Sequence, residues 1–291
     1  MGKSLKALAE LRQATALDPR NPRLHYAIAV TLTELRRYRE AEQQLEQALA
    51  IEPHDYDVMT YRVRMLFVSG RPQAARRALA QIPPNVDPQG SVSALHFWSA
   101  WLARKPQQAL AALAHAPDWV MGANMLYSVP ADLLRGEAQA MQGDRAVARK
   151  SYEDARTTLQ AALKRQPAPY LWGALGLTEA GLGNDDEAVK DGQQAVQLLP
   201  VTKNALYGTA HLAMLAAIYA RTNKPEQAVK LLRRLLSMPA GGPVSVPLLR
   251  LDPTWDPLRK NPRFQALLKQ YGKQIPAPAS SAASVGAPAT G

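Results

Sequence analysis

The sequence predicts an all-α protein in which pairs of helices stack into an α-solenoid closed by a C-terminal capping helix. The first observation is a period of 34 residues. A small residue recurs at this spacing, at Ala7, Ala41, Ala75 and Ala109, and a leucine follows each of them by four positions. The register then continues at intervals of 39, 40 and 40 residues to Ala148, Ala188 and Ala228. Periods of about 20 to 50 residues are typical of repeat proteins, in which each unit buries its apolar face only against its neighbours.

Each unit is predicted as a first helix, a short turn, a second helix and a break marked by proline. Ala41, Leu45 and Ala48 lie at i, i+4 and i+7, which places them on one face of a second helix. Pro53 follows Pro19 by 34 residues. Because proline cannot continue a helix and disfavours helical angles in the residue before it, these prolines set the length of the repeat.

Close contact between the two helices of a pair explains the alanine at the head of the second helix. The residue twelve positions upstream, in the first helix, also tends to be small: Ala29, Gly136, Gly176 and Ala216. Two small residues that face each other let helix axes approach to the short end of the usual range of about 8 to 10 Å. Val63 and Phe97 stand at this position in two units, which we expect to pack irregularly.

These positions resemble the tetratricopeptide repeat (TPR) family. One unit carries the family pattern at Trp172, Leu175, Gly176, Ala188, Ala195 and Pro200, and the next carries it at Leu215, Ala216, Tyr219, Ala228 and Leu232. The resemblance covers about residues 4–239 and implies a right-handed superhelix whose concave groove is lined by the first helices. In one unit, Gly192 departs from the pattern, which has a large residue there.

A narrower resemblance involves residues 181–200, 231–239 and 248–262. These stretches are similar to the C-terminal TPR region of bacterial multidomain signalling proteins, in which it follows a Ser/Thr kinase, cyclase or winged-helix domain. The sequence contains no such output domain. The resemblance therefore implies a role in bacterial signalling or regulation.

The two ends of the array are predicted to differ from its middle. Residues 5–17 form a second helix with no first helix before it. Three explanations stay open: the helix is a cap, the chain is a piece of a longer protein, or a partner completes the pair, by self-association for example. At the other end, Asn261 and Pro262 start a helix in which an apolar face covers the last pair: Phe264, Leu267, Leu268 and Tyr271.

The predicted organisation is therefore a solenoid over residues 1–240, made of half a repeat and about six pairs, and a capping segment over 241–272. Residues 273–291 are rich in proline, alanine and serine and poor in large apolar side chains. A segment of this composition cannot bury enough surface to fold, and we expect it to be disordered.

Composition limits the possible functions. The chain of 291 residues contains no cysteine, which excludes disulfides, thiolate zinc sites and cysteine nucleophiles, and fits a cytoplasmic protein. No apolar run of about 18 residues is present, so no membrane span is expected, and no export signal is visible. The net charge of +11 is concentrated in residues 61–120 (7 basic, 2 acidic) and 201–291 (12 basic, 3 acidic), which favours acidic partners.

No reactive centre is predicted. Gly2, Lys3 and Ser4 imitate the end of a phosphate-binding loop, but the upstream glycine and strand are missing. The five histidines are scattered without metal-ligand spacing. The acidic run 185–187 is best explained by the start of a helix, which favours negative charge. We therefore expect no catalytic, cofactor or metal residues, no small-molecule substrate and no enzymatic activity.

Aromatic and basic residues are the remaining candidates for a functional site. The TPR resemblance places five of them on the concave face of the first helices: Tyr26, Arg64, Phe67, Trp98 and Trp101. Aromatic residues beside arginine are enriched at the centres of protein interfaces. Filling of an irregular gap between repeats is the simpler interpretation of the tryptophans, and a peptide groove is the alternative. The family's carboxylate clamp needs asparagine where this chain has Val30, Arg64 and Trp98, so that clamp is not supported.

The leading hypothesis is a non-catalytic scaffold or adaptor that binds a polypeptide partner in the concave groove. The alternative is a basic helical-repeat protein that binds nucleic acid, suggested by the charge of residues 201–291 and by Arg233 and Arg234. In a second helix these arginines are better explained as part of the solvated convex surface, so nucleic acid is the less favoured partner.

Overall fold

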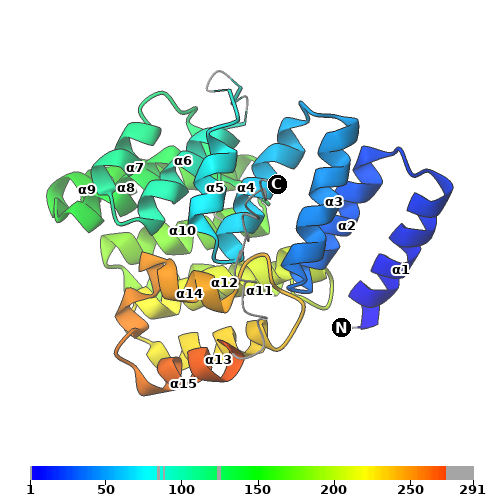
Figure 1. Ribbon diagram of the computed structural model, residues 1–291. Helices are drawn as coiled ribbons and strands as arrows, with labels where there is room; N and C mark the ends of the chain where they lie inside the picture. The colour runs from blue at the N-terminus through cyan, green and yellow to red at the C-terminus, as the bar shows by residue number, and fades with distance from the viewer. Residues whose placement is uncertain (1, 84–85, 88, 123–125, 273–291) are drawn as a thin grey trace, which may run out of the picture.

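Six helix pairs follow a single N-terminal helix in the computed structural model, which describes residues 2–83, 86–87, 89–122 and 126–272 (Figure 1). Within these residues the chain begins with α1 (Gly2–Leu17) and continues with the pairs α2 (Pro22–Glu34) and α3 (Tyr38–Ile51), α4 (Tyr56–Val68) and α5 (Pro72–Leu79), α6 (Ser91–Leu102) and α7 (Pro106–Ala112), α8 (Ala131–Gln142) and α9 (Arg145–Arg165), α10 (Pro169–Leu182) and α11 (Asp185–Leu198), and α12 (Ala205–Arg221) and α13 (Pro225–Leu236). The predicted α-solenoid is confirmed.

Further elements separate or follow these pairs. A two-stranded antiparallel ribbon, β1 (Trp119–Met121) and β2 (Ser128–Pro130), lies between α7 and α8. The helix α14 (Val246–Leu251), the 3₁₀-helix η1 (Pro253–Leu258) and α15 (Pro262–Gly272) follow α13. The ribbon was not predicted, because two runs of three residues are too short to show a periodic pattern.

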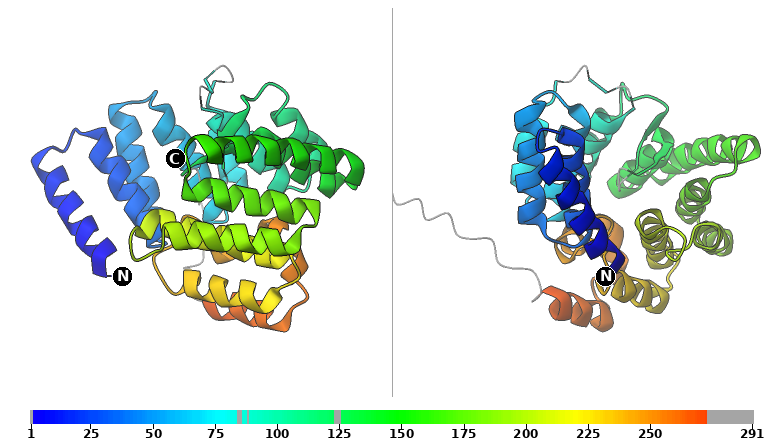
Figure 2. Two further views of the ribbon diagram at one scale, coloured as in Figure 1. Left: turned by 180° about the vertical axis from the view of Figure 1, so that it is seen from behind. Right: turned by 90° about the vertical axis from the view of Figure 1, so that its right-hand side faces the viewer.

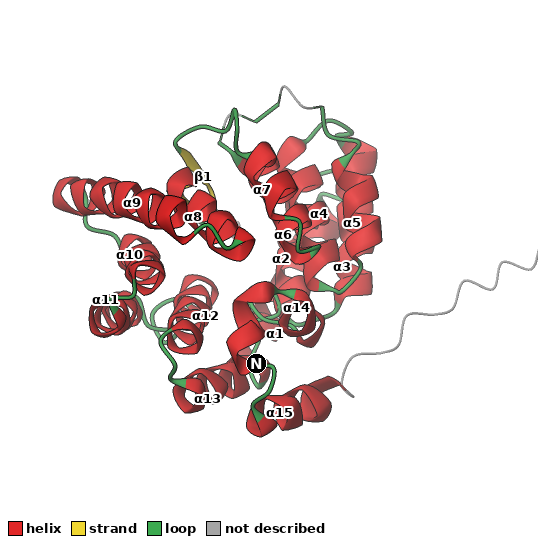
Figure 3. Cartoon of the chain, turned by 90° about the vertical axis from the view of Figure 1, so that its left-hand side faces the viewer, coloured by secondary structure: helices red, strands yellow, loops and turns green. Residues whose placement is uncertain are grey.

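The stack of pairs curves back on itself. In Figures 2 and 3 the pairs from α2 to α5 lie on one side of the molecule, and those from α9 to α11 lie on the other. The chain then returns through α12 and α13, so that α14 packs against α4. Segments separated by about 180 residues in the sequence therefore lie side by side.

Local signals explain where the helices begin. Proline occupies the first turn of α2, α5, α7, α10 and α13, where its missing amide hydrogen is not needed. The Asn204 side chain accepts hydrogen bonds from the amides of Leu206 (3.1 Å) and Tyr207 (3.0 Å) at the start of α12. Asp55 accepts one from the amide of Val58 (3.1 Å) at the start of α4.

The small residues at the helix crossings bring the paired helices together as predicted. Ala41 and Ala188 have no exposed surface. A Cβ atom built on Gly176 of α10 would lie 2.7 Å from the carbonyl oxygen of Ala188 in α11, which leaves no room for any side chain. The two pairs with Val63 and Phe97 at the crossing have short second helices, with eight residues in α5 and seven in α7 against fourteen in α3.

The last pair is covered by the helix predicted for this purpose. Phe264 and Leu267 of α15 have no exposed surface, and Leu268 is 5% exposed. They share an apolar cluster with Leu232 and Leu235 of α13. The predicted disordered segment, 273–291, lies outside the described residues.

Replacing Ala188 with leucine tests the crossing. The larger side chain overpacks the contact with α10, and we expect the free energy of unfolding to fall by about 1 to 3 kcal/mol, measured by urea denaturation. The control is Ala161→Leu at an exposed position of α9. Equal stability of the two variants would contradict close packing at the crossing.

A buried carboxylate lies in α11. Asp191 is 6% exposed. Burial, followed by the negative charges of Glu179 and Glu187, raises its pKa to about 7. An unfolded aspartate titrates near pH 4, so between about pH 4 and pH 7 the unfolded chain releases a proton that the folded chain keeps. This carboxyl therefore makes the free energy of unfolding fall as the pH rises through that window.

Asp191→Asn removes this ionisation. At about pH 8 we expect the variant to melt several degrees higher than the wild type, since each kcal/mol of stability raises the melting temperature by about 2 to 4 °C. At about pH 4 the two proteins should melt at nearly the same temperature. Asp185→Asn, at the exposed start of the same helix, should give no such gain. A gain for Asp191→Asn that does not depend on pH would show that the effect has another origin.

Candidate protein-interaction site

The five residues predicted for a peptide groove lie on the first helices of three successive pairs. Tyr26 is on α2, Arg64 and Phe67 are on α4, and Trp98 and Trp101 are on α6. Arg64, Phe67 and Trp101 are buried, at 4%, 2% and 6% exposure, whereas Tyr26 and Trp98 are half-buried. What covers the buried residues therefore bears directly on how this face can be used.

Aromatic contacts link the first two of these helices. The ring of Tyr26 meets the ring of Tyr61 edge to face, with centroids 5.3 Å apart. The guanidinium of Arg64 lies 5.8 Å from the centroid of the same Tyr61 ring, on α4. On α6, Trp101 stacks with Phe97 at 6.0 Å. The indole nitrogen of Trp98 is buried and has no hydrogen-bond partner among the described residues.

The chain covers part of this face with its own later residues. We call residues 238–259, which include α14 and η1, the C-terminal strap. In Figure 1 α14 is orange and lies below α4 and α5. The strap is held at three places, one for each of the first three pairs.

The first anchor is the turn between α2 and α3. The guanidinium of Arg36 donates hydrogen bonds to three backbone carbonyls, those of Met238 (2.7 Å), Leu235 (2.9 Å) and Val244 (3.2 Å). The amide of Gly241 donates to the carbonyl of Glu34 (3.0 Å). The hydroxyl of Tyr38 donates to the carbonyl of Gly241 (3.1 Å). Recognition at this anchor therefore depends mainly on backbone atoms of the strap.

The second anchor is the turn between α4 and α5. The hydroxyl of Ser245 donates a hydrogen bond to the carbonyl of Val68 and accepts one from the amide of Leu248 (3.1 Å), which caps α14. Pro247 packs so closely on Gly70 that a Cβ atom there would lie 2.5 Å from its ring. Glycine at position 70 is therefore required for this approach.

The third anchor is the end of α6. The indole of Trp101 donates a hydrogen bond to the buried carboxylate of Asp252 (2.9 Å). Arg104 forms a two-pronged ion pair with Asp256, with donor to acceptor distances of 2.5 and 2.7 Å. The hydrogen bond from Arg104 lowers the pKa of Asp256, whereas burial raises the pKa of Asp252.

The anchors lie at backbone positions that are equivalent from one repeat to the next. One residue in each turn between paired helices has a left-handed conformation: Arg36, Gly70, Arg104, Gly143, Gly183 and Asn223. Glycine is favoured at such positions, and another residue costs about 1 kcal/mol or more. Arg36 and Arg104 lie at the two turns where an arginine side chain holds the strap. At Gly143 and Gly183 a Cβ atom would meet nothing within 4 Å.

A polar cluster lies beneath the first anchor. Glu34 is packed against Gly242, and burial raises its pKa to about 7, although Arg64 and Arg36 act in the opposite direction. Within the described chain, one oxygen of Glu34, the hydroxyl of Tyr61 and the Nε atoms of Arg36 and Arg64 are buried without hydrogen-bond partners. The contact between strap and repeats is therefore polar and incompletely satisfied here.

The inner face of the later pairs is filled by other parts of the chain. Tyr127, next to the ribbon, stacks on Tyr170 of α10 at 5.4 Å and on His211 of α12 at 5.9 Å. Arg221 of α12 forms an ion pair with Glu137 of α8 (2.7 Å), and both side chains are less than one-fifth exposed. These contacts occupy the inner face of the later pairs.

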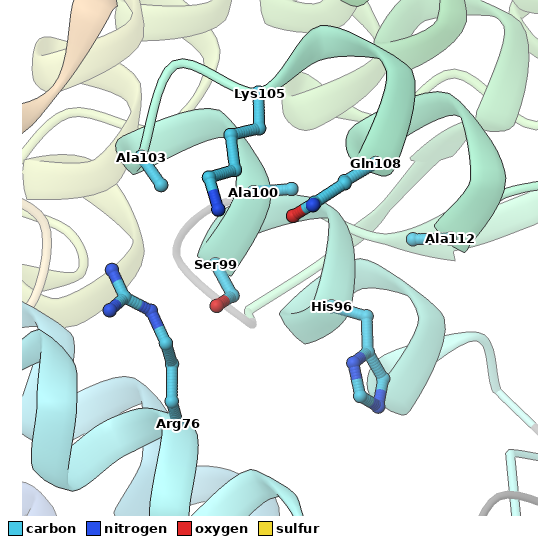
Figure 4. Close-up of a pocket in the computed structure, with 8 residues that line it drawn as sticks. All are labelled: Arg76, His96, Ser99, Ala100, Ala103, Lys105, Gln108 and Ala112. Atoms are coloured by element: carbon cyan, nitrogen blue, oxygen red, sulfur yellow. The ribbon is translucent and has the colours of Figure 1, made fainter.

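A separate depression lies over α6, between α5 and α7 (Figure 4). Its volume is about 420 Å³, and its lining includes Arg76, His96, Ser99, Lys105 and Gln108 but no carboxylate. Burial lowers the pKa of His96, which favours the neutral imidazole. The shortness of α5 and α7 leaves this side of α6 uncovered. The depression therefore presents two cations to any ligand that enters it.

Two further kinds of site were sought. The residues described by the structure contain no group of three or more histidine, aspartate or glutamate side chains that could hold a metal ion. In the same part of the chain, no helix is both long and apolar enough to cross a bilayer.

Sequence comparison agrees with this architecture. Two profiles, both described as tetratricopeptide repeat, match residues 1–47 and 32–96 and residues 131–201, which together make up more than half of the chain. The chain belongs to the tetratricopeptide repeat family. No curated protein matches the sequence.

Several solved structures are similar to this chain at low identity. The anaphase-promoting complex hetero-tetramer Cut9–Hcn1 is 16% identical with a TM-score of 0.47, and the match covers 92% of this chain and 52% of that one. The type IV pilus biogenesis factor PilW is 17% identical (TM-score 0.33; 80% and 85% coverage). Yeast Tom70 is 13% identical (TM-score 0.31; 94% and 66% coverage). The chain spans about half the length of the Cut9–Hcn1 chain.

The most informative TPR residues here are ones that the sequence analysis did not single out. Arg36 and Arg104 hold the strap, but the prediction considered only side chains on the first helices. Their signal is visible in the sequence, because Arg36, Gly70 and Arg104 share the 34-residue register of the repeat. The strap itself leaves no such signal, because its partners lie about 150 to 200 residues away.

Arg36→Ala tests the first anchor. The substitution removes a charged donor from three carbonyls, and hydrogen bonds to charged groups contribute roughly 1.5 to 3 kcal/mol each. We expect amide exchange of residues 238–245 to become at least about tenfold faster, measured by mass spectrometry. Gly143→Ala is the control, because it strains an equivalent turn where the strap is absent. Unchanged exchange in Arg36→Ala would show that the anchor contributes little.

Proposed function

We propose that this TPR protein is a non-catalytic scaffold that binds a polypeptide partner on the face formed by α2, α4 and α6. One observation carries the proposal: at the turns where α2, α4 and α6 end, the protein already holds a polypeptide segment, the C-terminal strap, through one anchor at each of three successive repeats. The side chains proposed to contact a partner are Tyr26, Arg64, Phe67, Trp98 and Trp101.

Trp98 is the residue of this set most directly available to a partner. It is half-buried, and its indole nitrogen lacks a hydrogen-bond partner among the described residues. A large, partly exposed aromatic side chain is the kind of group that contributes most to binding when an interface covers it. Arg64 lies beside Gly242 of the strap, and Trp101 is hydrogen-bonded to Asp252 of the strap.

We further propose that the partner is acidic and that the protein acts in bacterial signalling or regulation in the cytoplasm. The depression with Arg76 and Lys105 lies over α6, and it supports the first part by charge complementarity. The second part rests on the similarity of residues 181–200, 231–239 and 248–262 to TPR regions of bacterial signalling proteins.

Self-association through α1 is a second proposed contact. Leu8 of α1 is 3% exposed, but Leu5 and Leu17 are 47% and 90% exposed. These exposed side chains leave part of the surface of α1 available to a second copy. Sedimentation of the wild type and of Leu17→Glu distinguishes this contact from a monomeric cap.

Binding to a purified partner tests the function. We expect Trp98→Ala to weaken binding by about tenfold or more, measured by titration calorimetry after crosslinking has identified the partner. The control is His54→Ala, at an exposed position of the turn before α4. Affinity for the acidic partner should fall moderately between about 0.1 and 0.5 M salt, because salt screens the attraction of its charges to the basic residues but leaves the aromatic contact in place.

Two outcomes would contradict the proposal. Equal affinity of the Trp98→Ala variant and the wild type would place the partner on another surface. Tight binding of nucleic acid that falls steeply with salt, as phosphate neutralisation requires, would favour the basic-repeat alternative.

A further inference from the structure

The first anchor selects its occupant by size. A Cβ atom on Gly241 would lie 2.1 Å from the carbonyl oxygen of Thr33, and one on Gly242 would lie 2.2 Å from a carboxylate oxygen of Glu34. Neither glycine has a positive φ angle. Gly241 is therefore required for space and not for an unusual backbone conformation, because the atom that blocks a Cβ there belongs to the backbone. At Gly242 the blocking atom is the end of the Glu34 side chain, so a bound chain leaves Glu34 in place only if it carries two successive glycines.

The same anchor also fixes how the bound chain is oriented. Arg36 donates to two carbonyls of the strap, those of Met238 and Val244, and to one carbonyl of α13. The carbonyl of Glu34 accepts the amide of Gly241, and the hydroxyl of Tyr38 donates to the carbonyl of Gly241. These groups bind backbone atoms of the bound chain. Its side chains outside the glycine pair can therefore differ. A segment from another protein can satisfy the same donors and acceptors.

At the third anchor, the bound chain is recognised by its charge. Asp252 and Asp256 follow Gly241 by 11 and 15 residues and meet Trp101 and Arg104. A bound chain that spans all three repeats therefore needs a glycine pair followed, at about this spacing, by two acidic residues. This requirement agrees with the positive charge of residues 61–120.

Most apolar residues of the strap pack away from the first three pairs. Val244, Val246, Leu249 and Trp255 of the strap belong to the apolar cluster of α12, α13 and α15, and the first three pairs belong to another cluster. Leu248 and the partly buried Leu251 are exceptions, because they pack with the first cluster. Between the two clusters lie the polar groups of Glu34, Arg36 and Arg64, several of which lack partners. A permanent core is usually apolar and satisfied, so this polar boundary is typical of a surface that exchanges occupants.

From these observations we infer that the strap is an internal ligand, and that the turns at Arg36, Gly70 and Arg104 bind a partner segment with a glycine pair and two downstream acidic residues. The partner displaces the strap. This inference rests on the proposed function and gives the chemistry of the partner that the face recognises.

A labelled peptide of residues 235–258 tests the inference in trans. The receiving protein is the full chain with Gly241→Ala and Gly242→Ala, which prevents its own strap from fitting. We expect this variant to bind the peptide at least about tenfold more tightly than the wild type does, as measured by fluorescence anisotropy. A peptide with alanine at both glycine positions should not bind, and adding Arg36→Ala to the receiving chain should abolish binding.

A second measurement uses the wild type and covers the case in which the double variant fails to fold. Excess glycine-pair peptide, added to ¹⁵N-labelled wild-type protein, should accelerate amide exchange in the protein's own residues 238–251, and the alanine peptide should not. Equal effects of the two peptides, or no effect of either, would overturn the inference. If a purified partner still bound in a Trp98-dependent manner, the proposed function would stand and only the internal ligand would be rejected.

Discussion

The structure depends on close contact between the two helices of each pair. Small residues at the crossing, such as Gly176 against Ala188, let the helices approach until backbone atoms touch. That contact fixes where each turn lies, and repetition aligns the turns along the stack. Because every pair buries its apolar face only against the next, the curvature that results brings the C-terminal strap back to the first three pairs.

The aligned turns then acquire a second role. A left-handed residue is needed at each of them to reverse the chain, and glycine suits this purpose at positions 70, 143 and 183. At positions 36 and 104 arginine stands in its place, and both side chains hold the strap. A local conformational cost is thus retained where the side chain makes a long-range contact.

Much of the fold could be predicted because its causes are local. The period, the crossing alanines and the prolines at the starts of helices all appear within a window of one repeat. The strap could not be predicted in this way, because its contacts join residues about 150 to 200 positions apart, and those at the first anchor involve backbone atoms of the strap. Sequence reasoning placed Arg64, Phe67 and Trp101 on the first helices, but it could not show that the chain itself covers them. The ribbon at 119–130 was missed because its strands are three residues long.

The central claim is that the strap rests on the first three repeats in the free protein. Distances between spin labels test it most directly, and a chain without cysteine allows labels to be placed freely. With Gln43→Cys on α3 and Lys260→Cys after η1, both exposed, the account predicts one narrow distance distribution. A broad distribution in the free protein, or one unchanged when Gly241 and Gly242 are both replaced by alanine, would contradict it.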